Sequence, residues 1–151
     1  MHRQADRGVS PEQRYVALMA NKYTPYHEAS RIKAKEICEG IKTLPERFEA
    51  ITKYVSKAFS YDYIRAILIT KKNGLPDIDL CWKKHMGVCL DISSMTVGML
   101  RAVSIPCNLV IGWADGKYHA WVEAKIGNKK YLYDHEDLQG KVKTYKRERM
   151  Y

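Results

Sequence analysis

The segment that decides the fold runs from Gly87 to Trp113 and reads GVCLDISSMTVGMLRAVSIPCNLVIGW. Its first half carries apolar side chains at helical spacing, which predicts a buried helix over residues 90–103. The side chains on that face are Ile92, Met95, Met99 and Val103. Ile105-Pro106 ends the helix, and the apolar run NLVIGWA that follows predicts a strand. A buried helix that leads directly into a strand indicates a mixed fold with one shared core.

Two short turns predict how the sheet continues from this segment. Asp115-Gly116 separates NLVIGWA from YHAWVEAKI, and Gly127-Asn128 separates YHAWVEAKI from KYLYDHE. Both dipeptides suit two-residue hairpin turns, so the three strands are expected to form an antiparallel meander. The final stretch KVKTYKRERMY is expected to be a solvated edge strand or tail.

The sequence before Gly87 is predominantly helical in pattern. Helix-start signals stand at Ser10-Pro11, Thr24-Pro25 and Thr43-Leu44-Pro45. The first helix would end near Asn21. The second offers Ile32, Ile37 and Ile41 for burial, and the third has an apolar stripe of Phe48, Ile51, Val55 and Phe59. Residues 60–80 fit either a short helix or an extended piece. The predicted class is α+β, with N-terminal helices and a further helix packed on a small antiparallel β-meander.

Composition bounds the domain organisation and the class of function. The 151 residues predict a single domain, which we divide into a helical extension over 1–43 and a core over 44–151. The formal net charge is +9, but the lysines are spread along the chain, which favours a solvated basic surface over a specific nucleic-acid site. No apolar run approaches a membrane span. Residues 1–10 lack a signal-peptide core, although removal of a longer native N-terminus would leave secretion open. The four cysteines are too few for a disulfide scaffold and leave both pairing and compartment open.

The turn at Gly127-Asn128 determines which side chains meet across the sheet. If these two residues form the turn, counting back along both strands puts Trp121 opposite Asp134. His119 then shares a face with Trp121 and is the diagonal neighbour of Asp134, within reach of a hydrogen bond. A three-residue turn would direct Asp134 away and bring Asp137 opposite His119 instead. The other face of this strand is expected to pack on the helices; it carries Ala120, Val122, Ala124 and Ile126.

Cys89 stands at the start of the buried helix, where a thiol can act as a nucleophile. The positive end of a helix and a nearby imidazolium both stabilise a thiolate. With His119 as acid/base and Asp134 orienting its ring, the trio would transfer acyl groups from amides through a thioester. Gly87 is expected to let the backbone turn sharply into the helix. Asp91 is expected to interact favourably with the positive end of the helix dipole and not to act as a catalytic acid.

The quoted segment, together with YHAWVEA and YLYD, resembles the transglutaminase-like superfamily of papain-like cysteine enzymes. The family pattern has a glycine before the cysteine, an acidic residue after it, Leu-Arg and Ile-Pro downstream, and a histidine followed by Ala-Trp-Val-Glu. The matches are Gly87, Cys89, Asp91, Leu100-Arg101, Ile105-Pro106, residues 119–123 and Asp134. The resemblance runs from about Leu44 to Tyr151. It implies a transglutaminase-core fold and a Cys89–His119–Asp134 triad that acts on protein or peptide amides. The chain departs from the pattern at His135-Glu136, where many members have Pro-Thr, and at Ser104, where a glycine is usual.

Two other classes of function stay open. One is a binding module on the same fold that does no chemistry, whose basic and aromatic residues serve an anionic or glycan partner. The other is a zinc site, because cysteine and histidine recur at intervals of four residues before the helix. Its candidate ligands are Cys81, His85 and Cys89, completed by Cys107 or His119. A loop at Gly87 argues against that site. We therefore predict an enzyme without metal or cofactor, and leave the acyl acceptor, the substrate and the oligomeric state open.

Overall fold

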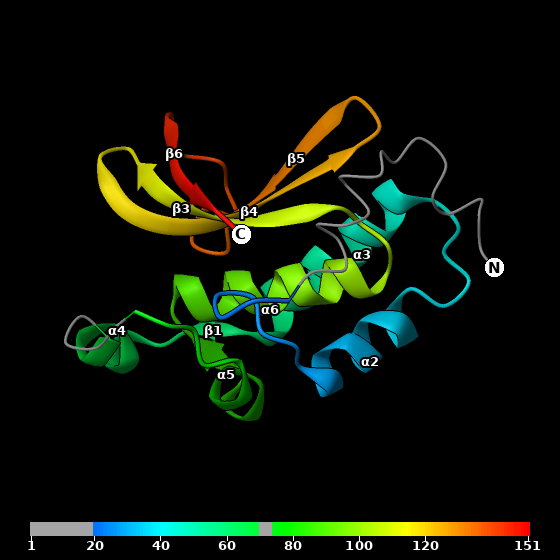
Figure 1. Cartoon of the computed structure of the whole chain (residues 1–151), viewed down its shortest axis with the longest axis horizontal. Helices are drawn as coiled ribbons and strands as arrows, with labels where there is room; N and C mark the ends of the chain where they lie inside the picture. Colours follow the sequence, from blue (N-terminus) through cyan, green and yellow to red (C-terminus); the bar gives the residue numbers. More distant parts are fainter. Residues whose placement is uncertain (1–19, 70–73) are drawn as a thin grey trace.

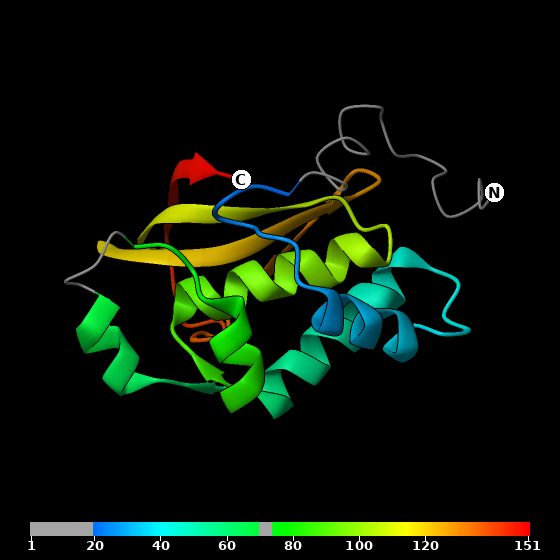
Figure 2. The same cartoon turned by 60° about the horizontal axis from the view of Figure 1, so that its bottom comes forward.

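The protein folds into two layers, an antiparallel sheet and a set of helices that covers one face of it (Figure 1). The computed structural model describes residues 20–69 and 74–151. A turned view shows helix α6 (Cys89–Ala102) directly under the sheet (Figure 2). The α+β prediction is confirmed, whereas the helix predicted from Ser10-Pro11 falls almost wholly on residues 1–19, outside the described residues. Within the part of the chain that is described, no helix is both long and apolar enough to span a bilayer.

Helix α2 (Glu28–Ile37) begins later than the sequence predicted. The residue before a proline avoids helical backbone angles, so the helix does not start at Thr24-Pro25. Its N-cap is His27, whose Nδ1 accepts a hydrogen bond from the N–H of Ser30 at 3.2 Å. The predicted burial of Ile32 is also wrong, since its side chain is 50% exposed. Small residues occupy the buried face, which allows α2 to pack closely on α6; they are Ser30, Ala34 and Cys38.

Helix α3 (Leu44–Ala58) confirms its prediction. Thr43 caps it, and the predicted stripe is buried. Residues 60–80, predicted as either a short helix or an extended piece, contain both kinds of structure. Short strands β1 (Ser60–Tyr61) and β2 (Met86–Gly87) pair in parallel, and helices α4 (Tyr63–Ile69) and α5 (Ile78–Lys84) lie between them in sequence.

Helix α6 ends just before Ser104, one of the departures from the family pattern. Ser104 has a φ of 69°, in the left-handed region where glycine is favoured. The N–H of Ser104 donates to the carbonyl of Arg101 at 3.2 Å, and that of Ile105 donates to Leu100 at 3.0 Å. This double hydrogen bond is a Schellman motif, which stops the helix before Pro106.

The main sheet has the strand order β5-β4-β3-β6. These strands are β3 (Cys107–Ala114), β4 (Lys117–Ile126), β5 (Lys129–Tyr133) and β6 (Tyr145–Met150). Both predicted hairpins have two-residue turns. Asp115 and Gly116 both have positive φ, as a type I′ turn requires, whereas Gly127 alone supplies it in the second turn, as in type II′. Strand β6 pairs with β3, so the last stretch forms an edge strand as predicted.

Candidate active site

Cys89 is the first residue of α6, and one buried carboxylate holds the backbone around it. Asp91 accepts hydrogen bonds from Arg65 at 2.6 and 2.8 Å, from the N–H of Asp77 at 2.9 Å and from the N–H of Val88 at 3.0 Å. Because Arg65 lies on α4 and Asp77 caps α5, this carboxylate fixes two other helices to the start of α6. The sequence predicted the position of Asp91 at the helix start but missed its ion pair with Arg65.

Gly87 is required for space and not for a special backbone angle. Its φ is not positive, so the backbone angle at this position does not by itself require a glycine. A Cβ at this position would lie 2.9 Å from both the Cβ of Asp91 and the sulfur of Cys81. Only a glycine therefore lets β2 pass this closely over the side chains of Asp91 and Cys81.

The sheet brings His119 to the thiol. The register pairs Val122 with Tyr133, and its continuation places Trp121 opposite Asp134, as the two-residue turn predicted. One turn into α6, the hydroxyl of Ser93 donates to the carbonyl of Ala120 at 3.3 Å. This contact fixes the start of the helix against the strand that carries His119.

The predicted neighbours His119 and Asp134 form a hydrogen-bonded pair. Nε2 of His119 lies 2.9 Å from both carboxylate oxygens of Asp134. Asp134 is buried, and it also accepts from the hydroxyl of Tyr145 at 2.9 Å and from the N–H of Glu136 at 3.1 Å. The ring of Tyr145 packs on Trp121, which is fully buried beside His119. With Nε2 engaged, Nδ1 is the ring nitrogen left to face Cys89, and a ring nitrogen of His119 lies within 4.8 Å of the Cys89 sulfur.

The surroundings favour a cationic imidazole. Burial opposes protonation, but the hydrogen bonds to Asp134 and Cys89 and their negative charge together raise the pKa of His119 to about 10. Burial likewise opposes ionisation of Asp134, yet the hydrogen bond and charge of His119 hold the pKa of that carboxyl below its usual range. A cationic ring in contact with Cys89 stabilises the thiolate.

The other three cysteines lie in different environments. Burial raises the pKa of Cys81 and of Cys107 to about 12, and it also raises the pKa of Cys38. All three are buried, whereas Cys89 is partly exposed. A soluble electrophile therefore reaches Cys89 more easily than the others.

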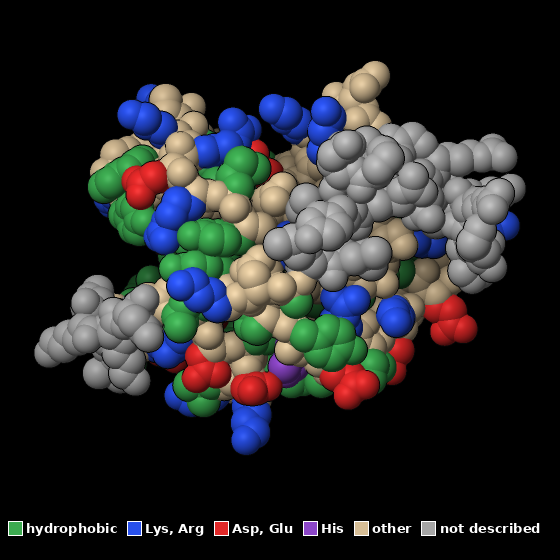
Figure 3. All heavy atoms as spheres, in the orientation of Figure 1, with side chains coloured by type: hydrophobic (Ala, Val, Ile, Leu, Met, Phe, Trp, Pro, Cys, Tyr) green, Lys and Arg blue, Asp and Glu red, His purple; other side chains and the backbone are tan. Residues whose placement is uncertain are grey.

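Two pockets open beside Cys89. The first, the thiol pocket, has a volume of about 470 Å³, and its walls include Cys89, His119, Tyr23, Tyr118 and Arg149. The second, the tyrosine pocket, has a volume of about 690 Å³ and is lined by Tyr61, Tyr63, Ala66, His135 and Glu136. Tyr61 and Ala66 line both pockets, so the two are neighbours. In the face shown in Figure 3, Lys and Arg side chains are scattered and do not form one block.

The predicted zinc set is wrong. Its residues do not converge, because α5 ends before His85. The His85 ring stacks on Phe59, with ring centroids 4.7 Å apart, and Cys81 is buried under β2. Among the described residues, a different group of three could hold a metal ion. It comprises Cys89, His119 and Glu136, whose ligand atoms lie within 4.8 Å of one another. Thiolate, imidazole and carboxylate are all zinc ligands, and an ion there would occupy both the thiol and the imidazole.

Residues 31–134, more than half of the chain, match the transglutaminase-like superfamily. The chain belongs to that superfamily. This transglutaminase-like protein is therefore a member of a family of cysteine-dependent enzymes. No curated protein has a significant sequence match to it.

Solved structures share the transglutaminase-like fold at low sequence identity. A candidate cysteine protease from Cytophaga hutchinsonii is 21% identical with a TM-score of 0.68, over 86% of this chain and 44% of that one. The periplasmic domain of TgpA from Pseudomonas aeruginosa, bound to ethylmercury, is 18% identical with a TM-score of 0.62, over 87% of this chain and 51% of that one. A candidate protease from Parabacteroides distasonis is 17% identical with a TM-score of 0.58, over 80% and 25%. The chain thus spans about half or less of each of these proteins.

Proposed function

We propose that the protein transfers acyl groups from protein or peptide amides through a thioester on Cys89. His119 serves as the acid/base and Asp134 as the carboxylate that orients it. The observation that carries this proposal is the position of His119, which has a ring nitrogen within 4.8 Å of the Cys89 sulfur and Nε2 at 2.9 Å from both oxygens of Asp134. Hydrolysis by water, as in proteases, and transfer to a second amine are the two forms of this reaction.

The first half of the reaction uses the ion pair. The Cys89 thiolate attacks the amide carbonyl carbon, and the backbone N–H groups at the start of α6 can donate to the oxyanion. As the carbon–nitrogen bond breaks, imidazolium His119 gives its proton to the departing amine, which leaves a thioester and a neutral ring.

The second half returns the enzyme to its starting state. Neutral His119 takes a proton from water or from an amine as it attacks the thioester. The carbon–sulfur bond breaks, the acid or new amide leaves, and Cys89 is again a thiolate beside an imidazolium. Asp134 keeps the ring in one orientation and stabilises its charge throughout.

Alkylation by iodoacetamide, read out by peptide mass spectrometry, tests the activated thiol. At pH 6 we expect Cys89 to react roughly tenfold or more faster than a model thiol, because a thiolate is the reactive form. His119→Gln should remove this advantage, whereas His27→Asn, which removes another imidazole but keeps an N-cap, should not. Equal rates for Cys89 and the model thiol would count against the enzyme.

Turnover is tested with a labelled casein substrate in the presence and absence of a fluorescent primary amine. We expect either released peptides or incorporated amine, and neither from a Cys89→Ala variant. Cys38→Ala, which removes a buried thiol, should leave the activity intact. Activity that survives Cys89→Ala would contradict the proposal, and a binding function unaffected by Cys89→Ala would favour the non-catalytic module instead.

A further inference from the structure

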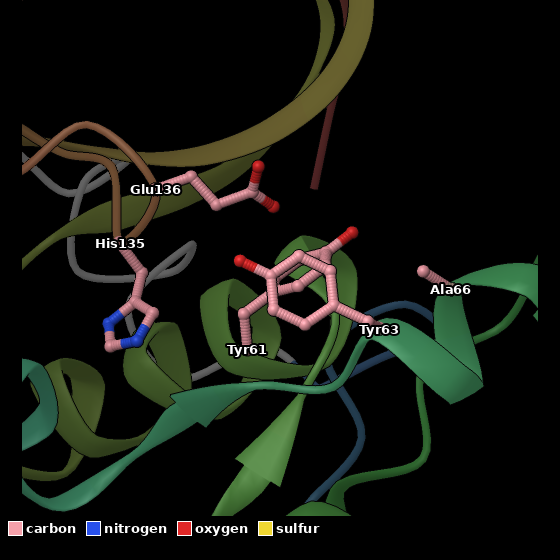
Figure 4. Close-up of a pocket in the computed structure, with 5 residues that line it drawn as sticks. All are labelled: Tyr61, Tyr63, Ala66, His135 and Glu136. Carbon is pink, nitrogen blue, oxygen red and sulfur yellow. The ribbon is translucent and has the colours of Figure 1, made fainter.

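The tyrosine pocket lies beside Cys89, and the chemistry proposed above gives it no function. Figure 4 shows the Glu136 carboxylate reaching from the segment between β5 and β6 over the rings of Tyr61 and Tyr63. The tyrosines come from β1 and α4, on the opposite wall. The pocket therefore has a carboxylate on one side and two aromatic rings on the other.

The arrangement of the aromatic rings is not explained by core packing. Tyr61 and Tyr63 meet edge to face with ring centroids 4.8 Å apart. The Tyr63 side chain is 75% exposed, so it adds little buried surface to the fold. Exposed aromatic faces opposite a carboxylate attract organic cations through the ring quadrupole and through charge.

Charge is divided between the two pockets. The tyrosine pocket has Glu136 and no lysine or arginine among the described residues that line it. The thiol pocket has Arg149 instead, which donates to the hydroxyls of Tyr118 at 2.9 Å and Tyr23 at 3.4 Å. Although Glu136 is exposed as a residue, partial desolvation of its carboxylate raises its pKa, with the charge of His119 opposing and that of Asp134 adding to this effect. A bound cation would stabilise the charged carboxylate against both the desolvation and the repulsion from Asp134.

We propose that the tyrosine pocket binds the protonated side chain of a lysine or arginine in the amide substrate. This inference rests on the proposed function, because it takes Cys89 as the reacting group. The ligand atoms of Glu136, Cys89 and His119 lie within 4.8 Å of one another, so the basic residue is at or next to the amide that reacts. Glu136 belongs to the His135-Glu136 pair at which this chain departs from the family pattern.

Protection of Cys89 against iodoacetamide tests the proposal on the full chain. The probes are N-acetyl-lysine amide, N-acetyl-norleucine amide, which lacks the ammonium group, and N-acetyl-glutamate amide. We expect the lysine derivative to protect at about fivefold lower concentration than the norleucine derivative, with the glutamate derivative weakest. Each variant is compared with its own rate in the absence of probe, so that effects on the thiol cancel.

Three variants connect the preference to the pocket. Glu136→Gln should bring the protective concentrations of the lysine and norleucine derivatives to within about twofold of each other. Tyr63→Leu should weaken protection by lysine while leaving protection by norleucine nearly unchanged. Glu39→Gln, which removes the same charge from the surface at the end of α2, should change neither. All three positions are exposed, so folding is expected to be retained.

The outcomes separate this inference from the proposed function. Equal protection by all three derivatives, or none, overturns the cation site, as does a lysine preference that survives Glu136→Gln. If Cys89 alkylates fast at pH 6 but shows no lysine preference, only the cation site fails. If Cys89 alkylates no faster than a model thiol, the proposed function fails, whatever the probes do.

Discussion

The pair formed by His119 and Asp134 leads to the most demanding prediction. The pKa of His119 rises from 6.5 to about 10, which corresponds to roughly 5 kcal/mol of preference for the protonated ring. Burial opposes this rise, so Asp134 and Cys89 supply all of it. We expect Asp134→Asn to remove about half, roughly 2 to 3 kcal/mol, and thus to bring the titration of His119 down toward neutral pH.

Two measurements check this prediction. NMR titration of the imidazole resonances, assigned with a His119→Gln variant, should show a large downward move of the midpoint in Asp134→Asn. The catalytic efficiency should fall by roughly a hundredfold or more, because the ring loses its orientation and its charge partner. In the wild type, activity should decline as the pH rises through about 10, where His119 loses the proton that the leaving amine needs.

The matched control is Asp137→Asn, which removes a carboxylate close in sequence that accepts from the backbone N–H groups of Lys141 and Val142 instead of from His119. It should leave the His119 midpoint almost unchanged.

The shift in the pKa of His119 also predicts how the stability of the fold depends on pH. The raised pKa contributes stability below pH 6.5 that is lost as the pH rises through about 10, and Asp134→Asn should flatten this dependence. An unaltered His119 midpoint in Asp134→Asn would refute the reasoning.

Three further predictions concern the scaffold of the site, and denaturant or thermal unfolding checks each of them. Arg65→Gln leaves the buried carboxylate of Asp91 without its cation and should lower the free energy of unfolding by about 3 kcal/mol; a loss below about 1 kcal/mol would mean that other donors suffice. Ser104→Gly relieves the left-handed backbone at the end of α6 and should raise stability by about 1 kcal/mol, or the melting temperature by about 2–4 °C, and a decrease would be contrary to the φ of 69°. Gly87→Ala should lower the free energy of unfolding by about 2 kcal/mol, because the added Cβ would overlap with Asp91 and Cys81. Adding Cys81→Ala to this variant should restore part of the lost stability, and no recovery would contradict the overlap.

Local patterns accounted for much of the fold. The periodicity of α3 and α6 and the glycine-containing turns each depend on residues close together in the chain, and the structure confirms them. The start of α2 was the exception, since the proline that suggested it also restrains Thr24. The division between a helical extension and a core at residue 44 stays a prediction.

Contacts between distant segments could not be predicted in the same way. Nothing near Asp91 in the sequence indicates that Arg65 is its partner, and nothing near Asp134 indicates Tyr145. The exposed position of Glu136 beside two tyrosines depends on how the β5–β6 segment lies opposite α4 and β1. Such contacts depend on how whole elements pack, and packing has no period in the sequence.

The amino-acid sequence by itself determined that His119 and Asp134 are neighbours if the turn at Gly127-Asn128 has two residues, because turn length and strict alternation along a strand set the register of a hairpin. Only the tertiary structure decided that Cys89 reaches this pair and that Glu136 lies beside it. Those distances depend on the placement of α6 under the sheet, which the Ser93–Ala120 hydrogen bond holds, and on the Asp91–Arg65 ion pair, which fixes α4 to the start of α6.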